Sequence, residues 1–309
     1  MAKALLTRLA PVDSLRDAAE TVLQRIVFDP LTGARLTRPL YWTVAPAVFQ
    51  RFSPTDFTDR TAAPDQFTIE RVDPRRIRRF TPRIYPPWHD RAESFGRVES
   101  GNWDRRPYDA TPCHGGPPME LFYADRIEDG PFYRAIESHF VDGVHWEDTE
   151  FVRRVIDLLE DGHQFVWRDC SCREDVLAQC RRVEELHRSM RRRGCLSYRE
   201  LTSASRREEG FLRCMNQEIV VDVGRDGELL LVSGKHRYAV ARALGLDEIP
   251  VAFLVRHAKW MEVRRAAARG AEAVPVEPAD HPDLRDINES GAGTFPERLS
   301  ERLPGMCSE

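Results

Sequence analysis

The stretch from Glu218 to Val255 sets the strongest constraint on what this chain can fold into. It holds two apolar runs, over 219–223 and 229–232, on either side of the turn sequence Gly-Arg-Asp-Gly. These runs predict two strands joined by a tight turn, and a third apolar run that ends at Val255 predicts another strand. Between the second and third strands we expect a helix that Ser233 caps and that Gly245 ends in the left-handed conformation.

The start of that helix has the composition of an anion site. Residues Ser233, Gly234, Lys235, His236 and Arg237 bring three basic side chains to a place where backbone N–H groups lack partners and the helix dipole is positive. A lysine here departs from the arginine usage of the rest of the chain, and a compact ammonium suits phosphate as a point charge. The only lysines are Lys3, Lys235 and Lys259. The alternative interpretation is a solvated helix start.

These residues resemble the ParB/sulfiredoxin superfamily, in which a Gly-x-(His/Arg)-Arg segment at the start of a helix binds nucleotide phosphates. Upstream, residues 185–194 look like the first sequence box of that family, a helix that ends in Gly. Downstream, residues 243–251 resemble its helix exit into a strand. The resemblance covers about a quarter of the chain, over 183–255 with a gap, and its order and spacing carry more weight than any single motif.

The resemblance implies an α+β fold with a ParB/sulfiredoxin-like core, a small mixed sheet with helices. This chain would add a helical N-terminal arm and a long insertion. A strand over 67–72, ended by Asp73-Pro74, is expected to open the core. The expected division is an N-terminal helix and extended arm over 1–62, the core domain over 63–258 with its insertion at about 80–165, and a short helix with a polar tail over 259–309. Beyond about Asn288 the tail is expected to be disordered.

Apolar periodicity predicts further helices. Two lie over 131–140 and 151–160. A longer one should begin at a capping box formed by Ser171 and Glu174, and should run to Gly194. Its core face is expected to contain Val176, Cys180, Val183, Leu186 and Met190. Residues 202–216 read as a polar, charged insertion before the central strands.

Composition limits the classes of function. The seven cysteines are an odd number in a chain of 309 residues, which argues against a secreted disulfide framework. No Cys-x-x-Cys pair is present, so we expect no metal site. The net charge of −4 gives no overall attraction to nucleic acid or to a membrane surface, and no run of about 20 apolar residues predicts a membrane span. The chain is expected to be cytoplasmic.

Two segments allow two interpretations each. The basic run over 75–83 fits a solvated or acid-paired face better than a nucleic-acid patch. The segment over 84–120 is rich in Trp, Gly and Pro, which is typical either of a functional loop that stacks on a ligand or of an irregular segment anchored to the core, the reading we favour.

The family's known chemistries narrow the function. Sulfiredoxins have a reactive cysteine where this chain has Lys235, so sulfinic acid repair is excluded. Partition ParB proteins carry a helix-turn-helix DNA reader after the nucleotide domain, whereas only a short polar stretch follows Val255, which argues against sequence-specific DNA binding.

The resemblance then favours an NTP-dependent phosphotransferase or NTPase that uses ATP or CTP with magnesium and an unknown small-molecule or protein acceptor. Gly234 and the amides after it would hold the phosphates, with Lys235 and Arg237 neutralising charge and His236 donating to a phosphate oxygen. The candidate bases are Glu218, Asp222 and Asp226. The alternative is a non-catalytic, nucleotide-gated binding or scaffold protein with the same cradle.

Overall fold

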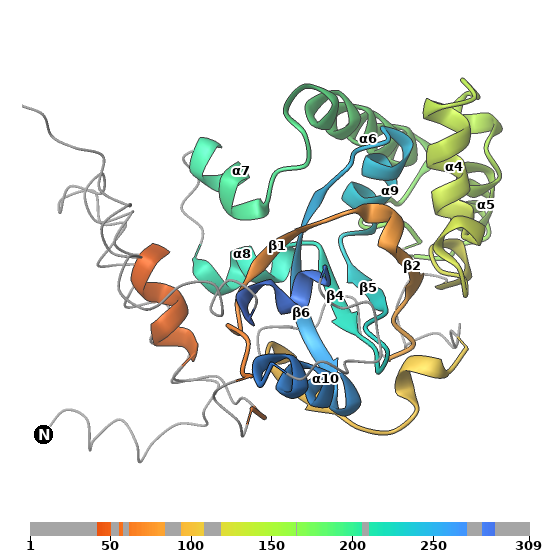
Figure 1. Ribbon diagram of the computed structural model, residues 1–309. Helices are drawn as coiled ribbons and strands as arrows, with labels where there is room; N and C mark the ends of the chain where they lie inside the picture. The colour runs from red at the N-terminus through yellow and green to blue at the C-terminus, as the bar shows by residue number, and fades with distance from the viewer. Residues whose placement is uncertain are drawn as a thin grey trace, which may run out of the picture.

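The computed structural model describes residues 42–50, 56–57, 62–83, 94–107, 119–164, 166–205, 210–270 and 280–287. Within these residues the fold is α+β, as predicted, with one mixed sheet between layers of helices (Figure 1). The expected helix near the N-terminus and the tail beyond Asn288 lie outside the described residues.

The sheet has the order β1-β6-β4-β5-β2, and β3 pairs with the second half of β6. Its strands are β1 (Ile69–Val72), β2 (Ile77–Phe80), β3 (Arg97–Glu99), β4 (Val220–Val223), β5 (Leu229–Ser233) and β6 (Ile249–His257). β6 is antiparallel to β1 and parallel to β3 and β4, whereas β5 is antiparallel to β4 and parallel to β2. The stretch that opened the sequence analysis therefore supplies three adjacent strands at the centre of the sheet.

Helices cover both faces of this sheet. They are residues 42–50, α4 (Pro131–Phe140), α5 (Glu150–Glu160), α6 (Arg173–Arg193), α7 (Tyr198–Ser205), α8 (Phe211–Gln217), α9 (Lys235–Ala243) and α10 (Ala258–Ala268). On one face, α9 contacts α4 and α6, and α5 contacts both α4 and α6 (Figure 1). The opposite face packs against α8 and the helix over 42–50.

The alternation of side chains along the strands explains the two layers. On β4, Val221 and Val223 join the larger core with α4, α5, α6 and α9, whereas Val220 joins the smaller core with α8. On β5, Leu231 and Leu230 divide in the same way. Both faces of the central strands are therefore buried, which is why their sequences are continuously apolar.

The predicted strands, the helices α4, α5 and α9, and the left-handed Gly245 are confirmed. The core face of α6 is confirmed for Val176, Cys180, Val183 and Met190, which are all buried.

Several local expectations were wrong. Gly234, not Ser233, is the N-cap of α9, and the Ser233 hydroxyl donates instead to the Glu218 carbonyl at 3.3 Å. The capping box is also absent, because Ser171 bonds the Asp175 carboxylate and Cys172 is the N-cap of α6.

Two elements were missed because each is a short apolar stretch within a longer segment that is polar or rich in Pro, Thr and Arg. Residues 42–50 form a helix rather than an extended arm, with Ala45 and Phe49 buried. Residues 211–217 form α8, whose Phe211 and Met215 are buried in the smaller core, and not a polar insertion. In both cases the apolar residues of the short helix pack into the smaller core, although the sequence around the helix is polar.

Candidate functional site

The candidate site lies at the start of α9, directly after the central strand β5. Gly234 has φ 88° and ψ 18°, and a Cβ at this position would lie 2.9 Å from the Ile219 Cα. Only glycine fits such a turn so close to a neighbouring backbone. In the described part of the chain, the backbone N–H groups of Lys235, His236 and Arg237 find no acceptor. The helix therefore begins with free donors at the positive end of its dipole.

Lys235 faces aromatic rings instead of an acid. Its Nζ lies 3.7 Å from the centre of the Phe122 ring and 4.7 Å from that of Tyr123. Burial, together with the positive charge of Arg168, lowers the pKa of Lys235 to about 7. No carboxylate pairs with this amine among the described residues. Burial and the nearby positive charge make protonation of Lys235 unfavourable, and a bound anion would offset this free-energy cost.

Arg168 is the second cation of the site. Its φ of 54° makes it the one non-glycine residue in the left-handed region among those described. The side chain is exposed, and it has no ion pair in the described part of the chain. Its charge lowers the pKa of both Lys235 and His236, so it lies near both. Lys235 and Arg168 are therefore two cations whose charges act on each other and for which no ion pair is found among the described residues.

His236 points into the larger core and does not contribute a charge. Its Nε2 accepts a hydrogen bond of 3.3 Å from the Trp167 indole, and its ring lies 4.7 Å from the Phe132 ring. Burial, Lys235 and Arg168 together hold the pKa of His236 well below its usual value. The ring is therefore neutral at pH 7, and the indole bond assigns its proton to Nδ1.

Arg237 turns the other way, toward the start of α7. Its Nη1 lies 3.6 Å from the Glu218 carboxylate and donates to the Leu196 carbonyl at 3.4 Å, and its Nη2 donates to the Gln217 carbonyl. The guanidinium thus holds the chain before β4. The expected convergence of three cations is reduced to Lys235, with Arg168 as an unforeseen second member.

The carboxylates proposed as bases have structural partners. Glu218 is buried and accepts the N–H groups of Tyr198 (2.8 Å) and Arg199 (3.2 Å) at the start of α7. Burial raises the pKa of Glu218, although Arg237 and the two N–H groups oppose the rise.

The carboxylates of Asp222 and Asp226 also pair with residues away from the start of α9. Asp222 is fully buried and accepts from Thr81 (2.7 Å), Arg83 (3.1 Å) and the Val255 N–H (3.1 Å). Burial raises the pKa of Asp222 against the opposing charge of Arg83. Asp226 is exposed and pairs with Arg105 at 2.7 Å.

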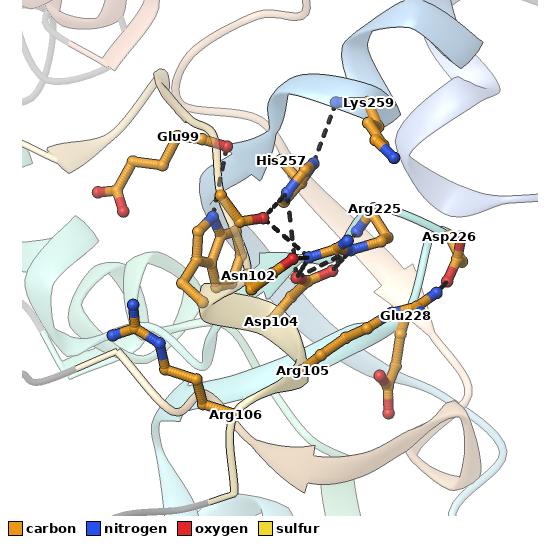
Figure 2. A network of polar contacts seen from close by, with 12 residues as sticks. Glu99, Asn102, Asp104, Arg105, Arg106, Arg225, Asp226, Glu228, His257 and Lys259 are labelled. Atoms are coloured by element: carbon orange, nitrogen blue, oxygen red, sulfur yellow. Dashed lines mark hydrogen bonds and ion pairs between the residues drawn. The ribbon is translucent and has the colours of Figure 1, made fainter.

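A dense polar network lies at the far end of β4 and β5 (Figure 2). Arg225, in the β4–β5 turn, donates to Asp104 at 2.6 Å and to the Gly101 carbonyl at 2.8 Å. The Nε2–H of His257 donates to the same carbonyl at 2.9 Å, and its ring lies 5.8 Å from that of Trp103. Burial raises the pKa of Asp104, but the bonds from Arg225 outweigh it and lower the pKa. These groups satisfy one another, so the network fastens the 94–107 segment to the sheet.

Other expectations find partial answers. Trp103 is buried, which supports the anchoring interpretation for the part of the Trp-rich segment that the structure describes. The basic run is largely acid-paired, with Arg75 on Asp73 and Arg79 on Glu228. Cys180 is 2 % exposed, and burial raises its pKa to about 12, so it is a core residue as predicted. The described residues contain neither a group of three potential metal ligands nor a helix able to cross a membrane.

Comparison with known proteins adds no relative: no family model, no curated protein and no solved structure matches the chain.

The sequence analysis missed Arg168, Trp167, Phe122 and Tyr123, which come from loops far from α9 along the chain. No local pattern marks them, because their importance comes only from packing beside α9.

Proposed function

We propose that this protein binds the phosphate groups of a nucleotide at the start of α9. The observation that carries the proposal is that Lys235, whose Nζ lies 3.7 Å from the Phe122 ring centre, has no carboxylate partner in the described part of the chain, while the charge of Arg168 also acts on it. The free N–H groups of α9 and its dipole favour the same kind of ligand. Phosphate oxygens would supply the negative charge that the protein does not.

Binding is favoured over phosphoryl transfer by the state of the carboxylates. Glu218 caps α7, and Asp222 joins β4 to Arg83 and to β6. A general base needs a free lone pair within hydrogen-bond reach of the acceptor hydroxyl, and both groups are buried with their oxygens engaged. The proposed function is therefore a non-catalytic nucleotide-binding protein, with an NTP-dependent phosphotransferase or NTPase as the second candidate.

Calorimetric titration of the purified protein with ATP and with CTP, each with magnesium, tests this proposal. Arg168→Ala should weaken binding by about ten- to a hundredfold, as expected for the loss of one charge-assisted contact. Lys235→Met should do the same while preserving the length of the side chain. Lys259→Met, which removes an exposed lysine on α10, is the matched control and should bind like wild type.

Arg237→Ala distinguishes two roles for Arg237. The family resemblance makes it a phosphate ligand, whereas its contacts in the structure make it a residue that stabilises the fold. The contacts of Arg237 predict a loss of stability with nucleotide affinity preserved in the folded fraction. The proposal is overturned if neither nucleotide binds wild type, or if Lys235→Met and Arg168→Ala bind as wild type does. If the protein releases phosphate from the nucleotide and this release depends on Lys235, the second candidate, an NTPase, replaces the non-catalytic binding protein.

A further inference from the structure

A cavity of about 190 Å³ lies between β3, α10 and the short segment over 56–57. Most of the residues that line it are apolar, and these are Phe57, Ala62, Val98, Ala258 and Met261. Ala62 and Met261 are buried and form its floor, whereas the other three are partly exposed, so small molecules can enter from solvent. A cavity of about 150 Å³ is large enough to hold benzene. This cavity therefore has room for a small apolar group.

Two side chains of opposite charge also line the cavity, and neither has a charged partner among the described residues. Arg265 of α10 makes no ion pair there. Asp56 accepts the Val98 N–H at 3.0 Å, but no cation in the described part of the chain pairs with it, Arg265 included. Asp56 is exposed and Arg265 is partly exposed, so both charges lie nearer to solvent than the apolar floor. The cavity thus combines an apolar interior with one positive and one negative group.

The lack of a partner for Arg265 is unusual for its surroundings. On the same helix, Arg264 pairs with Asp286 at 2.7 Å, and on the adjoining strand β6 Arg256 pairs with Asp283 at 2.6 Å. A charge that is partly removed from water without a partner costs free energy, and a ligand of opposite charge recovers it.

We propose that this cavity binds a small apolar amino acid as its zwitterion. The ligand's carboxylate pairs with the Arg265 guanidinium, its ammonium group pairs with the Asp56 carboxylate, and its side chain packs on the apolar floor. A ligand that carries only a carboxylate meets repulsion from Asp56, and a simple amine meets repulsion from Arg265. The two groups together therefore select a ligand that has both charges. The cavity shares no residue with the proposed nucleotide site.

Leucine and three related molecules test the proposal. Isocaproate is leucine without its ammonium group, isoamylamine is leucine without its carboxylate, and glycine lacks the apolar side chain. Saturation-transfer NMR titrations of the full chain at pH 7 measure the affinity for each. Leucine should show saturable binding, and each of the other three should bind at least about tenfold more weakly, because each loses one of the three contacts.

Three variants of the cavity locate the contacts. Arg265→Gln should weaken leucine binding at least about tenfold without weakening isoamylamine. Asp56→Asn keeps an oxygen that can accept the Val98 N–H, and it should weaken leucine without weakening isocaproate. Ala258→Leu, which fills the cavity, should abolish leucine binding. Lys259→Gln, which removes an exposed charge from the same helix, is the matched control and should bind leucine as wild type does.

The inference is overturned if leucine does not bind to the wild type, or if isocaproate or isoamylamine binds as tightly as leucine. It is also overturned if leucine binds equally well to the three cavity variants, each shown to be folded by circular dichroism. Nucleotide titrations of the same variants should match wild type. Loss of leucine binding and loss of nucleotide binding depend on different residues, so this proposal and the proposed function can fail independently.

Discussion

At the start of α9, the backbone conformation and the close packing of position 234 both require glycine. Its backbone is left-handed, and its α-carbon lies against Ile219. Gly245, at the other end of the same helix, is also left-handed, with φ 64°, but a Cβ there would meet nothing within 4 Å. Gly245 is therefore required only for its left-handed backbone, whereas Gly234 is required both for that backbone conformation and for lack of space for a Cβ.

The comparison gives a prediction at the residue scale. Gly245→Ala should lower the free energy of unfolding by about 1 kcal/mol, the cost of placing a side chain in the left-handed region. Gly234→Ala should lower it by at least about 2–4 kcal/mol, because the clash with Ile219 adds to that cost. Urea unfolding followed by circular dichroism measures both. Equal losses in the two variants would show that α9 does not approach β4 as closely as described.

Among the elements, the segment over 280–287 shows how a polar tail can become part of a core. Asp283 is 4 % exposed and accepts from Arg256 at 2.6 Å and from the Trp260 indole at 2.8 Å, with Arg264 at 3.5 Å. Burial raises the pKa of Asp283, but the two guanidinium groups outweigh it and lower the pKa. Asp283 therefore neutralises Arg256 of β6 and shares Arg264 of α10 with Asp286, which lies closer to Arg264, at 2.7 Å.

Replacing Asp283 with Asn should be costly for that reason. The substitution keeps the shape but leaves the buried Arg256 without its carboxylate, whereas Arg264 keeps its pair with Asp286, and breaking such a buried pair costs about 3–5 kcal/mol. Thermal and urea unfolding should both show the loss. Asp226→Asn, which breaks an exposed pair with Arg105, is the matched control and should change stability by less than about 1 kcal/mol. A similar loss in both variants would contradict the burial of this network.

Local sequence explains which elements could be predicted. The runs that form β4, β5 and β6 are strongly apolar, and Gly245 marks the end of α9, so the centre of the fold was readable. β2 was not, because half of it is arginine and its register comes from pairing with β5. The same contrast holds at the site. Lys235 was predicted from its motif, whereas Arg168 lies near it only because the loop before α6 packs on α9.

For the whole molecule, the insertion is part of the main body and not an appendage. α4 and α5 come from the expected insertion, yet Phe132, Ile136 and Val155 share one buried core with Tyr238 of α9. The Tyr238 hydroxyl also donates to the Ile77 carbonyl at 2.5 Å, which links α9 to β2. Because the insertion shares the larger core with α9 and the sheet, the two are expected to form one folding unit.

We therefore expect a single cooperative unfolding transition. Unfolding followed by the fluorescence of the six tryptophans, among them Trp146 and Trp167 in the α4–α6 layer, should coincide with unfolding followed by far-ultraviolet circular dichroism. The calorimetric and van't Hoff enthalpies should also agree. An early loss of the tryptophan signal that persists in a Trp103→Phe/Trp260→Phe variant would mean that the insertion folds independently of the sheet.

The close fit of Gly234 against Ile219 also bears on how quickly a ligand can be captured. β4 lies in the middle of the sheet, so the turn that presents Lys235 is fixed as soon as the domain folds. A ligand of the proposed site would then meet a turn that is already in place, and no part of the α9 start would have to become ordered on its arrival. Association at this site is expected to be a single step limited by encounter, with selectivity expressed in how long the ligand stays.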